Sequence, residues 1–290
     1  MRVGFLSSYD PERIAFAHAN GCESIGLIVK AGDPLLPSAS DWKEVAAEVR
    51  GEFAAVGMTL SSVGGMYGNI LDPAQAGELT KLFRATVELA VELGTRVVGC
   101  FAGRVMGRPL EQSLPAFTQT WGELAKYCAG LGVRIAFENC PQGAFHQPPD
   151  GFNFFCTPEM WECGFNELPD DNVGLQWDPS HLVCQFIDPV ENLKRFGKKV
   201  FHVHAKDAKI DRTNLARYGL WHPATMAHRF PGLGDSDWTA IVRELKAQGY
   251  DASLDIEGWH DPVYHGARED EGLLIGIRHL KRALSEAQKR

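Results

Sequence analysis

One local pattern recurs along the whole chain: an amphipathic stretch, then a glycine, then a short apolar run. It is clearest in residues 77–101, GELTKLFRATVELAVELGTRVVGCF. One face of that stretch carries Leu79, Leu82, Phe83, Val87, Ala90 and Val91. The spacing is that of a helix face, Gly94 can supply a left-handed C-cap, and residues 95–101 are typical of a buried strand. Similar stretches surround Gly21, Gly57, Gly132, Gly197 and Gly249, so helices and strands are predicted to alternate along the chain.

The pattern yields eight predicted strands, each followed by helical sequence. They are Arg2–Leu6, Ser24–Val29, Met58–Val63, Thr95–Phe101, Val133–Asn139, Val173–Asp178, Lys199–Ala205 and Ala252–Glu257. Near-continuous apolar strands that alternate with helices are typical of a parallel sheet covered by helices. Eight such units without a linker predict one domain, residues 1–290, folded as a closed (β/α)8 TIM barrel. An open doubly wound sheet is the alternative, but no GxGxxG opens a helix after any strand.

Composition narrows the classes of partner. The chain has 29 Lys and Arg against 37 Asp and Glu, a formal charge of −8, which opposes binding to nucleic acid. No apolar run is long enough to cross a membrane, and the first residues carry no secretion signal. The 7 cysteines are scattered and predict reduced thiols rather than disulfides or a zinc finger. We therefore expect a cytoplasmic protein without nucleic-acid or membrane partners.

Four successive predicted strands end in residues that can bind a metal ion: Glu138, Asp178, His204 and Glu257. The carboxyl ends of barrel strands lie at one rim, and neighbouring strands are about 4.8 Å apart, so these side chains can converge. Three carboxylates and one imidazole form a mostly oxygen site that suits Mn²⁺, Mg²⁺ or Co²⁺. The sequence thus predicts one divalent ion, with Mn²⁺ expected first and Zn²⁺ also open.

Each of these residues also has a plainer interpretation when it is taken singly. Asp178 precedes Pro179 and could simply cap the following helix. His202 and Asp255 share the inward parity of two candidate ligands, and we expect them to pack or hydrogen-bond beneath the metal rather than bind it. Four candidate ligands at consecutive strand ends favour a metal site over four unrelated caps.

Specific motifs along almost the whole chain carry a family resemblance. They are WDPSH at 177–181, HVHAKD at 202–207, RFPGLGDSDW at 229–238 and DIEG at 255–258. Through these motifs the chain resembles the xylose isomerase-like barrel superfamily. Within that superfamily it resembles the sugar phosphate isomerase/epimerase group, which includes tagatose 3-epimerase and inosose dehydratase. The resemblance implies the same four metal ligands.

The resemblance also implies substrate-binding residues. His181 matches a substrate-contacting histidine, and Arg229 matches an arginine that binds a substrate oxygen. One position departs from the pattern: ketose 3-epimerases have a second glutamate six residues after the first ligand, where this chain has Ala144. The metal centre is thus supported by the motifs, whereas a ketose substrate is not.

These residues predict proton transfer next to a carbonyl. A divalent ion that chelates a carbonyl and an adjacent hydroxyl acidifies the neighbouring C–H and stabilises an enediolate. Glu138 and Glu257 are the expected catalytic pair, one removing a proton and the other returning one. Lys206 shares the inward parity of His204 and could stabilise an oxyanion, or it could form an ordinary salt bridge with Asp207. Among the aromatic residues, Phe5, Phe145, Trp177 and Trp259 could either line the site or belong to the core.

The expected function is a divalent-metal-dependent sugar or sugar phosphate isomerase or epimerase. A lyase or dehydratase acting on a keto-sugar, inosose or 3-keto-glycoside would use the same site. An endonuclease IV-like repair enzyme is a distant alternative, because the second, third and fourth strand ends lack histidines and Met226 stands where an Asp-x-His pair would begin. A non-catalytic sugar-binding module is the remaining class. The expected partner is a small sugar-like or polyol-derived substrate, and homo-oligomerisation is left open.

Overall fold

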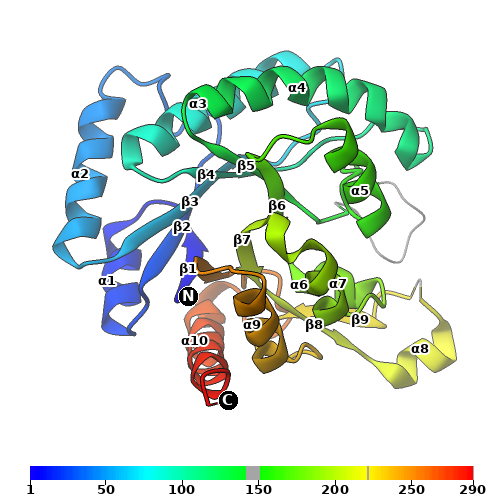
Figure 1. Ribbon diagram of the computed structural model, residues 1–290. Coiled ribbons are helices and arrows are strands. Elements are labelled where there is room, and N and C mark those ends of the chain that lie inside the picture. The colour runs from blue at the N-terminus through cyan, green and yellow to red at the C-terminus, as the bar shows by residue number, and fades with distance from the viewer. Residues whose placement is uncertain (142–150, 221, 290) are drawn as a thin grey trace.

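The computed structural model describes residues 1–141, 151–220 and 222–289, and its centre is a closed parallel barrel (Figure 1). The barrel strands are β1 (Arg2–Ser7), β2 (Ser24–Ile28), β3 (Thr59–Met66), β4 (Val97–Cys100), β5 (Arg134–Glu138), β6 (Val173–Trp177), β7 (Val200–Ala205) and β10 (Ser253–Ile256). Each strand pairs with its neighbours in chain order, and β10 closes the ring against β1. The predicted (β/α)8 barrel is confirmed, and each predicted strand agrees with an observed one to within a few residues.

Helices surround the barrel, as Figure 1 shows for α2 to α5 and for α9 and α10. They are α1 (Pro11–Ala19), α2 (Trp42–Ala55), α3 (Ala76–Leu93), α4 (Leu114–Gly130), α5 (Pro158–Glu167), α6 (Pro179–Cys184), α7 (Pro189–Phe196), α9 (Trp238–Ala247) and α10 (Glu269–Glu286). Helix α3 buries Phe83, Val87 and Ala90, and Gly94 ends it with a φ of 80°. The helical periodicity and the glycine C-cap are both confirmed there.

The barrel interior is polar at its amino-terminal end. The Asp255 carboxylate accepts hydrogen bonds from the hydroxyl groups of Ser24, at 2.7 Å, and Ser61, and its Oδ2 lies 2.7 Å from His202 Nε2. Gly4 leaves room for this group, because a Cβ there would lie 2.4 Å from Asp255 Oδ1. His202 and Asp255 therefore bond to each other inside the barrel, whereas the sequence predicted only that neither is a metal ligand.

Residues 206–237, between β7 and α9, form a structured connection. It contains the strands β8 (Asp207–Ile210) and β9 (Met226–Arg229), paired antiparallel, with α8 (Arg212–Tyr218) between them. Ala208, Ile210 and Met226 pack with Cys184 of α6 in a small apolar cluster. That packing explains why the segment forms a hairpin rather than an open loop.

No helix in the described part of the chain is long and apolar enough to cross a membrane.

Candidate metal centre

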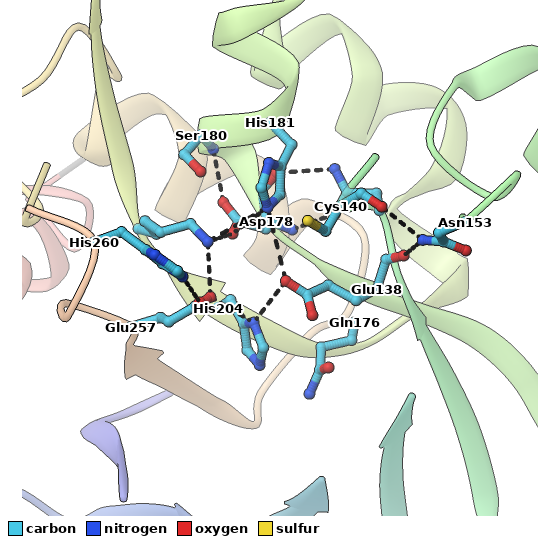
Figure 2. Close-up of polar contacts among 12 residues, drawn as sticks. Glu138, Cys140, Asn153, Gln176, Asp178, Ser180, His181, His204, Glu257 and His260 are labelled. Carbon is cyan, nitrogen blue, oxygen red and sulfur yellow. Dashed lines mark hydrogen bonds and ion pairs between the residues drawn. The ribbon is translucent and has the colours of Figure 1, made fainter. Parts of the chain in front are cut away.

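The four predicted metal ligands meet at the carboxyl end of the barrel. Glu138 is the last residue of β5, Asp178 follows β6, His204 lies in β7, and Glu257 follows β10. One ligand atom from each lies within 4.8 Å of those of the other three, and the side chains point toward one another in Figure 2. All four residues are buried, with at most 5% of their surface exposed. The convergence expected from the strand ends is thus what the structure contains.

Asp178 caps a helix and also faces the cluster of candidate ligands. Its Oδ1 accepts a hydrogen bond of 2.8 Å from the backbone N–H of Ser180 and so caps helix α6. Its Oδ2 faces the cluster, 3.3 Å from His181 Nε2. Asn139 fixes this turn, because its side chain accepts from the backbone N–H of Asp178 and donates to the Asp178 carbonyl. The cap orients the carboxylate that faces the candidate metal site.

Lys206 lies inside the cluster rather than at its rim. The side chain is 2% exposed, with Nζ 2.8 Å from Asp178 Oδ2 and 2.9 Å from Glu257 Oε2. The alternative salt bridge to Asp207 is wrong, because Asp207 Oδ1 accepts from the backbone N–H of Ser236 and its Oδ2 accepts from the Trp238 indole. Asp207 stabilises the end of the hairpin insertion, whereas Lys206 is a buried counterion within the candidate centre.

The charges in the cluster depend strongly on one another. Burial raises the pKa of Glu138, but His204 and His181 together outweigh it and bring the pKa to about 2. Burial likewise raises the pKa of Glu257, yet Lys206, His204 and His260 together hold it well below its usual value. For His204 burial lowers the pKa, while the Glu138 and Glu257 carboxylates raise it to about 10. Without a metal the glutamates are ionised, and His204 carries a proton between them at 3.3 and 3.0 Å.

The donor set fits a divalent cation. Three carboxylates and the Lys206 ammonium sum to two negative charges once His204 is neutral, as a metal ligand must be. Within the described residues Asp178 Oδ2 and His204 Nδ1 are held by ion pairs with Lys206 and the two glutamates and form no hydrogen bond, and His204 Nε2 forms none either. Buried polar atoms of this kind normally have partners. Glu138, Asp178, His204 and Glu257 can therefore hold one such ion.

A cavity of about 410 Å³ opens onto this cluster. Among its lining residues are the predicted substrate-binding residues His181 and Lys206 and the wall residue Trp259. Sequence analysis did not single out further lining residues, which are Leu6, Ile28, Tyr67, Phe101, Cys140, Pro141, His228 and His260. The volume is in the range of small-molecule sites and exceeds that of a single monosaccharide. The site thus combines a charged floor with largely apolar walls.

Arg229 lies outside the residues that line this cavity. Its Nε donates to Asp261 Oδ2 at 2.8 Å, so its predicted contact with substrate stays a prediction. The neighbouring His228 lines the cavity instead, 5.1 Å from His181 between ring centroids. Burial holds the pKa of His228 well below its usual value, so this ring is neutral. Strand alternation in the hairpin could have indicated that adjacent residues point to opposite sides.

The other positions that the sequence analysis named lie either in the core or outside the described residues. Phe5 and Trp177 are fully buried and belong to the core. Ala144 and Phe145 lie outside the described residues. Before Glu138 the sequence singled out only Phe5 as a residue that could line the site, yet Tyr67 and Phe101 lie on the cavity wall.

Comparisons with known proteins agree with this architecture. An uncharacterized protein, YfiH of Bacillus subtilis, is 26% identical over 95% of both chains. An inosose dehydratase of Geobacillus kaustophilus is 27% identical over 76% of this chain and 74% of its own. The solved structure of an L-ribulose 3-epimerase, 18% identical, superposes with a TM-score of 0.72 over 99% of this chain and 96% of its own. Residues 14–283 match the xylose isomerase-like TIM barrel family, and the chain belongs to that family.

Proposed function

We propose that this protein is a divalent-metal-dependent enzyme that isomerises or epimerises a sugar-like keto substrate. The observation that carries the proposal is the pair of buried, ionised glutamates on either side of His204, open to a cavity of about 410 Å³. When bound at Glu138, Asp178, His204 and Glu257, a divalent ion supplies Lewis acidity to a carbonyl and an adjacent hydroxyl of the substrate. The L-ribulose 3-epimerase of the same fold gives this proposal a precedent.

The two glutamates divide the proton transfers between them. For an epimer, one carboxylate accepts the proton from the carbon beside the carbonyl, and the other takes up a proton from solvent in the open cavity and delivers it to the same carbon, after which the first carboxylate returns its proton to solvent. For an isomer, the accepted proton is delivered to the neighbouring carbon and the substrate hydroxyl proton moves to the former carbonyl oxygen, so no net proton is consumed in either case. The Lys206 ammonium, 2.9 Å from Glu257 Oε2, keeps that carboxylate ionised and able to accept the proton.

A dehydratase is the second candidate, and the position of Lys206 and His181 favours it. The two side chains lie 3.3 Å apart in the same cavity and can supply the proton that a departing hydroxide needs to leave as water. The Geobacillus kaustophilus relative, an inosose dehydratase, supports this outcome. Both candidates share the first step, removal of a proton beside a carbonyl.

The test is proton NMR in D₂O with ketoses, inososes and 3-keto-glucosides. Each substrate is incubated with metal-loaded protein and with protein stripped by a chelator, and any paramagnetic ion is removed before the spectrum is recorded. We expect metal-dependent deuterium at the carbon beside the carbonyl. An epimer or isomer as product supports the first candidate, and an unsaturated product the second. If no substrate exchanges a proton although the protein binds one metal per chain, the proposed function is wrong.

A further inference from the structure

Tyr67 lines the cavity from the part of the barrel that carries no candidate metal ligand. It directly follows β3, which lies opposite β7, the strand of His204, in the eight-stranded ring. Its ring packs edge-on against Phe101 with the centroids 5.0 Å apart, and both residues line the cavity. The hydroxyl group donates to Gln176 Oε1 at 3.0 Å. Tyr67 is thus held by one polar contact and one aromatic contact.

That hydrogen bond is the first link of a chain that crosses the barrel interior. Gln176 Nε2 lies 3.1 Å from His202 Nδ1, and His202 Nε2 lies 2.7 Å from Asp255 Oδ2. Gln176, His202 and Asp255 are at most 1% exposed, so their polar groups depend on these partners. The chain therefore connects a cavity-lining hydroxyl to a buried carboxylate.

The Asp255 carboxylate fixes which group donates and which accepts in each of these hydrogen bonds. Asp255 accepts from two serine hydroxyls, so it also accepts from His202, which places the ring proton on Nε2. The Nδ1 atom is then an acceptor for the Gln176 amide N–H. The Gln176 amide oxygen consequently faces Tyr67 and accepts the hydrogen bond that the Tyr67 hydroxyl donates.

Two glycines provide the space for this arrangement. A Cβ at Gly64 would lie 2.2 Å from the Tyr67 hydroxyl oxygen, and a Cβ at Gly99 would lie 2.4 Å from Gln176 Nε2. Either contact is closer than side chains tolerate, so both groups occupy space that only glycine leaves open. The positions of Tyr67 and Gln176 therefore depend on small residues in the neighbouring strands β3 and β4.

With its hydrogen committed to Gln176, the Tyr67 oxygen can offer the cavity only lone pairs. We propose that Tyr67 is a substrate-binding residue whose oxygen accepts a hydrogen bond from a substrate hydroxyl. This inference rests on the proposed function, because it requires a polyhydroxylated substrate long enough to reach from the metal ligands to Tyr67. It also restricts the substrate class: the contacted position must carry a hydrogen-bond donor, which an ether, a ketone or a fluorine cannot replace.

The test compares Tyr67→Phe with the wild-type protein on a substrate that exchanges deuterium. We expect kcat/KM to fall about threefold to tenfold, mainly through KM, because a neutral hydrogen bond is lost and the metal centre is untouched. A set of monodeoxy substrates identifies the contact: for the one that lacks the contacted hydroxyl, the variant and the wild type should perform equally. Tyr250→Phe is the matched control, because its hydroxyl donates to the Ser253 carbonyl at 2.6 Å at the opposite end of the barrel. We expect that control to lose stability and keep its KM.

Each result decides the inference. An unchanged KM in Tyr67→Phe, or an equal loss with every deoxy substrate, would overturn it. If the wild type exchanges no deuterium with any substrate, the proposed function fails, and calorimetry with myo-inositol on the metal-loaded protein then decides the role of Tyr67. A threefold to tenfold weaker affinity in Tyr67→Phe supports the inference there, whereas equal affinities, or no binding to either protein, contradict it.

Discussion

The carboxyl ends of β5, β6, β7 and β10 carry the ionisable groups of the candidate centre, whereas those of β1 to β4 present Leu6, Ile28, Tyr67 and Phe101 to the same cavity. Both halves are built from the same repeating unit of strand and helix. In the charged half each side chain is held by a counter-charge, so that removing one leaves another unpaired in a buried place. In the other half, contacts with neutral neighbours predominate. On the proposed function, the charged half carries the reacting groups, and the neutral half contributes to the fit of the substrate.

The largest effect should come from the proposed proton acceptor in the charged half. Glu257→Gln removes the group that takes the proton but keeps its size, so the rate of deuterium exchange should fall by roughly 10³-fold or more. D₂O exchange followed by NMR measures it. Glu44→Gln, on the exposed face of α2, is the matched control and should keep the wild-type rate. Normal exchange in Glu257→Gln would remove Glu257 from the mechanism.

The next effect is on stability and concerns the buried counterion. Lys206→Met leaves Asp178 and Glu257 facing each other without their ammonium, which should lower the free energy of unfolding of the metal-free protein by about 3–5 kcal/mol. A bound divalent ion replaces part of the lost positive charge, so the loss should be smaller in the metal-loaded protein. Urea denaturation with and without metal measures both values. Equal losses in the two states would mean that Lys206 and the metal ion do not share these carboxylates.

A third prediction concerns the pH dependence of the metal-free protein. The pKa of His204 is about 10 in the folded chain and about 6.5 when unfolded, so its stabilising effect is complete below about pH 6.5 and is lost as the pH rises toward 10. Stability should fall between pH 7 and 10 by an amount on the order of a few kcal/mol. Urea denaturation across this range measures the slope.

The control for this third prediction is His204→Gln, which has no titrating ring at that position and should show a shallower slope. In the metal-loaded wild type the ring is a neutral ligand, so its contribution to the slope should disappear. A slope that is the same in the variant, the metal-free protein and the metal-loaded protein would contradict this account of the charges.

The smallest effect is expected in the half without metal ligands. Phe101→Leu removes an aromatic wall but keeps an apolar side chain, so KM should rise severalfold while kcat and metal affinity stay near wild type. Steady-state kinetics and metal titration measure the three quantities. A large loss of metal affinity would show that the two halves are not independent.

The fold and the metal ligands could be predicted because both follow from periodicity. The apolar runs define the strands, and the strand ends define one rim, so Glu138, Asp178, His204 and Glu257 follow from counting along the chain. Their convergence within 4.8 Å needs no knowledge of the loops.

The parts that could not be predicted depend on contacts between distant segments. Lys206 has Asp207 as its neighbour in sequence, but it pairs with residues from β6 and β10 because the hairpin insertion engages Asp207. The direction of His228 follows from the antiparallel pairing of β8 and β9, which local sequence does not reveal. The Tyr67 hydroxyl occupies space left by Gly64, and its partner Gln176 occupies space left by Gly99 on another strand. The spacing of residues along the sequence does not indicate these contacts.

The double use of Asp178 has a consequence for how such a protein can diverge. One oxygen begins helix α6 and the other faces the ion site, so a carboxylate one methylene longer could not serve the helix without withdrawing from the site. A substitution of Asp178 would therefore weaken both the start of helix α6 and the candidate ion site. The neutral wall around Phe101 carries no such double constraint. New substrate preferences should therefore arise from replacements on that wall, while the chemistry beneath it is inherited unchanged.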